Sequence, residues 1–241
     1  MYEYKNRIGF SQCDYKKRLM LSELIDIFQD CSTFQSEDVG AGFDFLTEKG
    51  LAWVINYWEL DIERLPMLCE WVTVGTFPHG MRGFLADRNF YLKDEEGNYI
   101  VKANTLWTFL NLKEAKPVRV LPEFYDIYKM EEKLDMNYGS RKVNIPEGEG
   151  VIVEEHEKVV IQKHHLDSNR HVNNGQYVKL ALACVDEGFD ISSCKRFRID
   201  YRKQAKLGDI IVPYVYKAED KIVVALKDEE DGIFSVAEIG K

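Results

Sequence analysis

The sequence predicts an α+β fold made of two tandem units, each with one long helix against a curved antiparallel sheet. Three observations predict it: two stretches with the apolar spacing of a helix, a series of strand-like segments after each stretch, and a pattern match between the two halves. With 241 residues, 45% of them hydrophobic, the chain is long enough to bury two cores.

The two expected helices lie near the start of each half, where apolar residues recur at helical spacing over 24–31 and again over 177–185. Strand-like segments follow the first helix at 52–61, 71–77, 84–92 and 99–110, and the second at 197–202, 210–216, 222–227 and 233–239. Shorter strands are expected ahead of the helices, at 2–10 and 158–163.

The two halves match under two shifts of the numbering. A shift of 153 positions carries Asp14 onto Asp167 and the first helix onto the second, and a shift of 139 then carries 61–64 onto 200–203. Because both matches occur in the same order, they indicate a duplicated unit. We therefore expect an N-terminal domain at 1–130, a polar linker at 131–150 and a C-terminal domain at 151–241 that carries the chemistry.

Composition and charge exclude several classes of protein. The formal net charge of −9 disfavours nucleic acid, whose phosphates need a basic surface. No segment approaches the ~18 apolar residues of a membrane span, and the polar start lacks the apolar core of a signal peptide, so we expect a cytoplasmic protein. The five cysteines are odd in number and irregularly spaced, which disfavours a disulfide framework or a structural zinc site.

The densest polar cluster, 164–174, lies directly before the second helix. Asp167, Asn169 and His171 alternate there, and an extended backbone would aim all three side chains to one side. They offer a base or nucleophile, an amide that orients water or substrate, and an imidazole that titrates near neutrality. At the helix start, free N–H groups near Asn174 and Gly175 would stabilise a developing oxyanion.

Other interpretations of this cluster remain open. Asn173 or Asn174 could be a helix cap, and Asp167 could close a turn. His165, Asp167 and His171 are metal-ligand types, although no second ligand cluster is evident and we expect no metal.

The first half differs from the second at two of the candidate positions. It has Lys16 and Arg18 where the second half has Asn169 and His171, so it looks like a chemically silent copy. The chain also lacks the Gly-x-Ser-x-Gly motif of serine hydrolases of the α/β type.

The segment 166–177 resembles the Asp-x-Asn-x-His-Val-Asn-Asn segment of acyl-acyl-carrier-protein thioesterases. The stretches 50–66, 80–82, 103–107 and 201–203 are similar to that family in the same order, so the resemblance covers nearly the whole chain. It implies a tandem pair of hot-dog domains, cleavage of the thioester between a fatty acid and the phosphopantetheine arm of acyl carrier protein (ACP), and no cofactor.

The resemblance also assigns residues. Asp167, Asn169 and His171 match the catalytic positions of the family. The family usually has a carboxylate after a Tyr-Arg-x motif, where this chain has Gln204 followed by Ala205. A glutamine can orient water but cannot take a proton as a glutamate can, so Asp167 is the expected base or nucleophile.

Two further sets of residues are candidates for substrate and partner. Bulky apolar residues of the first half would form the wall of an acyl slot, with Trp53, Tyr57 and Trp107 as the main candidates. A basic group in the second half would dock the acidic carrier protein, namely Arg196, Arg198, Arg202, Lys203 and Lys206. Ordinary sheet core and a solvated strand face are the alternatives.

Three rival functions remain on the sequence alone. An acyl-coenzyme A thioesterase of the same fold is the nearest, and a non-catalytic acyl-binding protein is suggested by Gln204. A hot-dog dehydratase is a weaker option. Exposed sheet edges would also allow a homodimer.

Overall fold

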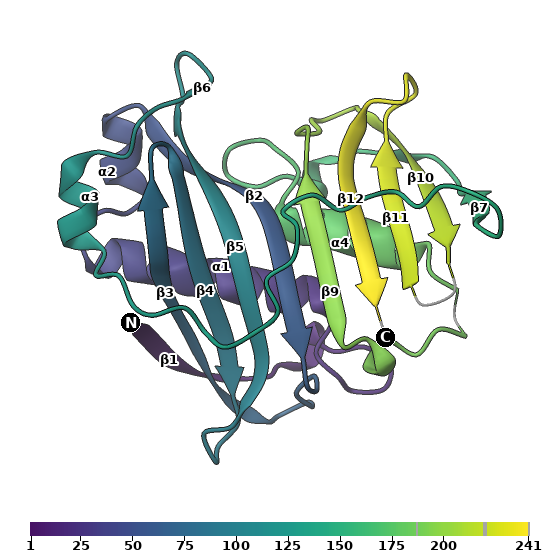
Figure 1. The fold of residues 1–241 in the computed structure, drawn as a ribbon, viewed down its shortest axis with the longest axis horizontal. Helices are drawn as coiled ribbons and strands as arrows, with labels where there is room; N and C mark the ends of the chain where they lie inside the picture. Colours follow the sequence, from purple (N-terminus) through teal and green to yellow (C-terminus); the bar gives the residue numbers. More distant parts are fainter. Residues whose placement is uncertain (187, 219–220, 241) are drawn as a thin grey trace. The chain divides into compact units, whose positions relative to one another are not determined.

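The computed structural model of the protein describes residues 1–186, 188–218 and 221–240. The chain divides into two compact units, unit 1 (Met1–Gly139) and unit 2 (Ser140–Lys241). Each unit has the predicted arrangement of one long helix on an antiparallel sheet (Figure 1). The segment 131–150 has no helix or strand, and its first nine residues belong to unit 1.

Unit 1 contains a sheet with the strand order β1-β3-β4-β5-β2, and the long helix α1 crosses one of its faces (Figure 1). The strands are β1 (Tyr2–Arg7), β2 (Leu51–Ile62), β3 (Trp71–Arg82), β4 (Leu85–Lys93) and β5 (Tyr99–Asn111), and β6 (Lys116–Pro117) pairs with β5. The helices are α1 (Leu21–Asp38), α2 (Phe43–Glu48) and α3 (Pro122–Ile127), with a 3₁₀ turn η1 (Phe10–Gln12).

The core of unit 1 lies between α1 and this sheet. Phe28 of α1 is stacked on Trp58 of β2 with ring centroids 6.0 Å apart, and it lies 5.3 Å from the ring of Phe90 in β4. All three side chains are fully buried, and each large apolar side chain contributes roughly 1.5–3 kcal/mol when it leaves water. The helical spacing seen in the sequence is therefore the buried face of α1.

A bulge interrupts β2 and changes which side chains face α1. Ile55 pairs with Trp107 and Tyr57 with Leu106, so Asn56 is an extra residue. Trp58, the next residue after Tyr57, faces α1, and Tyr57 therefore points to the opposite face of the sheet.

Unit 2 repeats this plan with fewer residues. Its sheet has the order β9-β12-β11-β10-β7, and helix α4 crosses one face (Figure 1). The elements are β7 (Ile152–Glu155), β8 (Val159–Val160), α4 (Asn174–Ala183), β9 (Arg196–Tyr201), β10 (Ile210–Lys217), β11 (Lys221–Lys227), β12 (Ile233–Gly240), and the 3₁₀ turns η2 (Lys163–His165) and η3 (Ile191–Ser193). β8 pairs with β10.

Backbone hydrogen bonds confirm the duplication under both numbering shifts. In unit 1, the N–H of Ile8 donates to the carbonyl of Glu70 at 3.0 Å. In unit 2, the N–H of Ile161 donates to the carbonyl of Asp209 at 2.9 Å. Ile161 corresponds to Ile8 by the longer shift and Asp209 to Glu70 by the shorter one, so the two halves share one backbone plan.

The predicted strands and both predicted long helices are present, with ends that differ by a few residues. Helices α2 and α3 have no periodic signal in the sequence, because helices of six residues depend on tertiary contacts. Phe124 of α3 supplies such contacts, since it is buried against Phe109 and Trp53. No helix within the described ranges is both long and apolar enough to cross a membrane.

Candidate active site

The segment from Leu166 to Val172 forms a tight turn, so the predicted extended backbone is wrong. Leu166 and Val172 make an antiparallel bridge, and the N–H of Asp167 donates to the carbonyl of His171 at 2.8 Å. Arg170 has a φ of 62°, in the left-handed region.

Asp167 closes this turn with its side chain. Its Oδ1 atom accepts hydrogen bonds from the N–H groups of Asn169 at 2.8 Å and His171 at 3.1 Å. Such an Asx turn satisfies two backbone donors locally, which explains why the chain reverses direction here. Among the described residues, no side chain forms a hydrogen bond or ion pair with Oδ2 of Asp167.

Unit 1 contains the same turn around Asp14. Its Oδ1 atom accepts from the N–H groups of Lys16 at 2.8 Å and Arg18 at 2.9 Å, and Lys17 has a φ of 61°. Nε of Arg18 lies 3.9 Å from the second carboxylate oxygen of Asp14. The aspartate thus builds the turn in both units.

What differs between the two turns is the residue four positions after the aspartate. Unit 2 has an imidazole, His171, at the position where unit 1 has the cation of Arg18. An imidazole can accept or donate a proton in general acid–base chemistry, whereas a guanidinium remains charged. Asp167 and His171 are both half-buried, whereas Asn169 is exposed.

The start of α4 lies next to this turn. Asn173 is the N-cap, and its Oδ1 atom accepts from the N–H of Gly175 at 2.9 Å. The N–H of Asn173 donates to the carbonyl of His165 at 3.0 Å, which ties the helix start to η2. Asn174 is the first helical residue and Gly175 is buried. The positive end of the α4 dipole is therefore held beside the Asp167 turn.

The loop that carries Gln204 joins the same region. The N–H of Val172 donates to the carbonyl of Ala205 at 3.2 Å, and the N–H of Ala205 donates to the hydroxyl of Tyr177 at 2.8 Å. Gln204 is exposed, directly before Ala205. The structure thus brings the Gln204 loop, the Asp167 turn and the start of α4 together.

Two tyrosines that sequence reasoning did not assign support this arrangement. Tyr201 donates from its hydroxyl to the carbonyl of Asn174 at 3.2 Å. Burial, and to a smaller extent the charges of Asp209 and Asp167, raise the pKa of Tyr177 to about 12, so its hydroxyl stays neutral.

His165 has a structural role in the turn η2. Its Nδ1 atom accepts from the N–H of Gln162 at 3.0 Å, as the side chain of Gln12 accepts from Gly9 in unit 1. Burial, followed by the positive charges of His164 and Lys179, lowers the pKa of His165. The signal in the sequence was its correspondence with Gln12. No three His, Cys, Asp or Glu side chains in the described part of the chain are grouped so that they could hold a metal ion.

The proposed wall residues of the acyl slot do not share one face of the sheet. Trp53 and Trp107 lie on the side that faces α1, because Trp107 pairs with Ile55, two residues from Trp53. Tyr57 is buried on the opposite face, beyond the bulge at Asn56.

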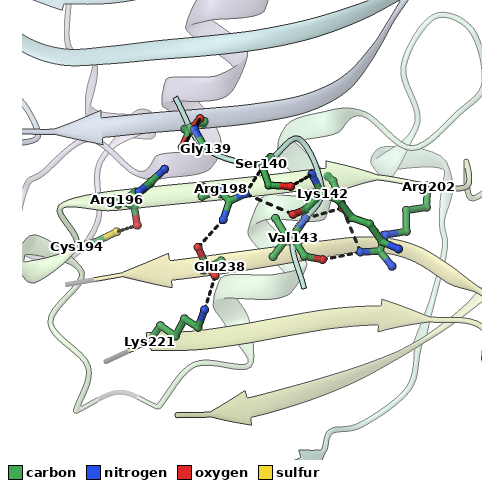
Figure 2. Close-up of polar contacts among 12 residues, drawn as sticks. Gly139, Ser140, Lys142, Val143, Cys194, Arg196, Arg198, Arg202, Lys221 and Glu238 are labelled. Carbon is green, nitrogen blue, oxygen red and sulfur yellow. Dashed lines mark hydrogen bonds and ion pairs between the residues drawn. The ribbon is translucent and has the colours of Figure 1, made fainter. Parts of the chain in front are cut away.

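Two of the five basic residues predicted to dock a partner are engaged inside unit 2 (Figure 2). Arg198, only 9% exposed, pairs with Glu238 at 3.0 Å and donates to the carbonyl of Ser140. Arg202 pairs with Asp200 at 3.0 Å and donates to the carbonyl of Val143 at 2.7 Å. These two arginines fasten the linker to β9.

The remaining three basic residues differ in exposure. Arg196 is half-buried, with a side-chain nitrogen fully enclosed. Lys203 and Lys206 are exposed on the loop that contains Gln204, and Lys203 pairs with Asp228 at 2.7 Å. Lys206 has no ion pair with any residue that the structure describes.

Comparison with protein families assigns both units. Residues 1–128 match the family model described as the acyl-ACP thioesterase N-terminal domain, and residues 151–236 match the acyl-ACP thioesterase C-terminal domain. No curated protein sequence is significantly similar to this chain.

Solved structures share the fold over nearly the whole chain. An acyl-ACP thioesterase from Bacteroides thetaiotaomicron is 21% identical with a TM-score of 0.88, and the match covers 99% of this chain and 96% of that one. The 12:0-ACP thioesterase from Umbellularia californica is 15% identical with a TM-score of 0.81, again over 99% and 96% of the two chains. These similarities confirm the predicted pair of tandem hot-dog units.

Proposed function

Because the chain belongs to the acyl-ACP thioesterase family, and is thus a thioester hydrolase that releases fatty acids from acyl-ACP in fatty acid biosynthesis, we propose that the Asp167 turn of unit 2 is its catalytic centre. The observation that carries this proposal is the contrast between two turns of the same geometry. Asp14 and Asp167 hold their turns alike, but the turn of Asp167 contains a histidine, His171, at the position where the turn of Asp14 contains Arg18.

The proposed mechanism uses the second carboxylate oxygen of Asp167, since Oδ1 is engaged by the turn. Asp167 removes a proton from a water molecule, whose oxygen bonds to the thioester carbonyl carbon. The positive end of α4 stabilises the oxyanion that forms. When the carbon–sulfur bond breaks, His171 gives a proton to the leaving thiolate. Asn169 and Gln204 orient the water and the substrate.

Measurement of thiol release from acyl-ACP tests this assignment. The variant Asp167→Asn keeps an oxygen that can close the turn but removes the base, so we expect hydrolysis to fall by about 100-fold or more. The matched control Asp14→Asn makes the same change in unit 1 and should retain wild-type turnover. Wild-type thiol release by the Asp167→Asn variant would refute the catalytic assignment.

The remaining parts of the proposal concern the acyl chain and its carrier. Trp53 and Trp107, on the α1 side of the unit 1 sheet, are proposed to line the acyl slot. Lys203 and Lys206 are proposed to attract the acidic carrier protein, because they are exposed on either side of Gln204.

A cytoplasmic location and a homodimer also belong to the proposal. All five cysteines are free thiols, which suits a reducing compartment. Ile152 and Val153 are exposed on β7, the last strand of the unit 2 sheet, where a second chain could pair. Light scattering of the purified protein would test the dimer.

A further inference from the structure

The layer between α1 and the sheet of unit 1 contains a buried arginine that the proposed mechanism does not use. Arg88, on β4, is only 8% exposed. Its Nη1 atom donates to Oε1 of Gln35 and, at 3.1 Å, to Oγ1 of Thr76, and its guanidinium lies 5.5 Å from the ring centroid of Tyr128. Burial lowers the pKa of Arg88 to about 10, so the group remains a cation at neutral pH.

This cation lacks a negative partner. None of the described carboxylates pairs with Arg88, and the three groups around it are an amide, a hydroxyl and a phenol. Its Nε and Nη2 atoms donate to no described residue, and they are not among the fully enclosed polar atoms. A buried charge without a charged partner is strongly unfavourable for folding, so it calls for an anion that reaches the Nε and Nη2 N–H groups.

The fold does not require an arginine at this position, because unit 2 does without one. Residues that pair directly across neighbouring strands form a row that crosses the sheet, and Arg88 belongs to one such row in unit 1. The strand pairing of unit 2 identifies the corresponding row there. The row in unit 1 consists of Trp58, Thr105 and Arg88, and the row in unit 2 consists of Phe197, Ile239 and Ile222. The duplicated unit thus has isoleucine where unit 1 has arginine.

We propose that Arg88 binds the carboxylate of a fatty acid in the layer between α1 and the sheet of unit 1. A carboxylate accepts two parallel hydrogen bonds from one edge of a guanidinium, which matches the edge formed by the Nε and Nη2 N–H groups of Arg88. The aromatic rings of Phe28, Trp58 and Phe90 pack on one another in the same layer, and the proposed alkyl chain would lie against this apolar cluster.

The carboxylate could come from either of two sources. One is the free fatty acid released by hydrolysis, and this source rests on the proposed function, in which the Asp167 turn carries out that hydrolysis. The other is an acyl chain that carries a second carboxylate at its far end. Both present the same group to Arg88, so the experiment has one arm for each.

The first arm measures binding of dodecanoate to the full chain by titration calorimetry, with dodecanol as the neutral counterpart. The variant Arg88→Ile introduces the residue that unit 2 has in this row, and we expect it to weaken dodecanoate binding by about tenfold or more while dodecanol binding is unchanged. Arg88→Lys keeps the charge and should retain part of the affinity, which keeps the test valid should Arg88→Ile fold poorly.

The second arm compares thiol release from dodecanoyl-ACP and from the ACP monothioester of dodecanedioic acid. A preference for the dicarboxylic chain that Arg88→Ile abolishes would identify that chain as the source. The proposal is overturned if Arg88→Ile, or Arg88→Met where the first variant is unfolded, binds dodecanoate as the wild type does and shows the same selectivity. Binding needs no turnover, so the first arm can be repeated in the Asp167→Asn protein and is independent of the catalytic assignment.

Discussion

Removal of each turn aspartate separates its structural role from its catalytic role. Asp14 and Asp167 each accept two backbone N–H groups through Oδ1, over 2.8 and 2.9 Å in unit 1 and over 2.8 and 3.1 Å in unit 2. The substitutions Asp14→Ala and Asp167→Ala remove both hydrogen bonds. Since one such bond contributes roughly 0.5–1.5 kcal/mol net, each variant should lower the free energy of unfolding by about 1–3 kcal/mol.

The matched pair predicts similar losses of stability and unequal losses of activity. Urea unfolding followed by circular dichroism measures the first quantity, and thiol release from acyl-ACP measures the second. Asp14→Ala should keep turnover close to wild type at temperatures where the protein is folded, whereas Asp167→Ala should abolish it. Asp167→Asn should abolish turnover with little change in stability, because its amide oxygen still accepts from the turn.

The same loss of activity, or no loss of stability, in the Asp14→Ala and Asp167→Ala variants would contradict this prediction. If Asp14→Ala reduced turnover as strongly as Asp167→Ala, loss of activity would follow from loss of the turn, and no special role of the Asp167 carboxylate would remain. If both Ala variants were as stable as the wild type, the hydrogen bonds of Oδ1 would not hold the turns, and the structural half of the argument would fail.

Two further predictions concern pH and the carrier protein. The folded-state pKa of His165 lies below its ordinary value near 6.5, so the unfolded chain takes up a proton first as the pH falls. The stability of unit 2 should therefore decrease as the pH falls from about 7 through 6.5. The variant His165→Gln, which introduces the residue that unit 1 has at position 12, should remove that decrease in thermal unfolding experiments. An unchanged pH dependence in this variant would contradict the prediction. For carrier docking, the variant Lys206→Glu should raise the KM for acyl-ACP several-fold at low ionic strength, because it places a negative charge where the acidic carrier would dock. The KM for a small acyl thioester should not change. An equal loss of activity on both substrates would argue against docking at this loop.

The amino-acid sequence by itself determined the duplicated plan and the residues proposed for the chemistry. Each half carries its own helical and strand periodicities, and these depend on neighbours in the chain, so the elements could be predicted before any contact was known. The shifts that relate Asp14 to Asp167 and 61–64 to 200–203 follow from the same local patterns, and the backbone hydrogen bonds agree with them. The contrast between Arg18 and His171 was visible for the same reason.

Only the tertiary structure decided which side chains are available and which way they point. Alternation along β2 predicts a common face for Trp53 and Tyr57, but the bulge at Asn56 puts them on opposite faces. Arg198 reads as a surface cation until Glu238, forty positions away, pairs with it. Arg88 has no signal in the sequence, because its neighbours Gln35, Thr76 and Tyr128 come from distant segments. Local patterns fix the elements of this fold, whereas burial and pairing of charges depend on residues far apart in the chain, and these meet only when the sheet and helix pack.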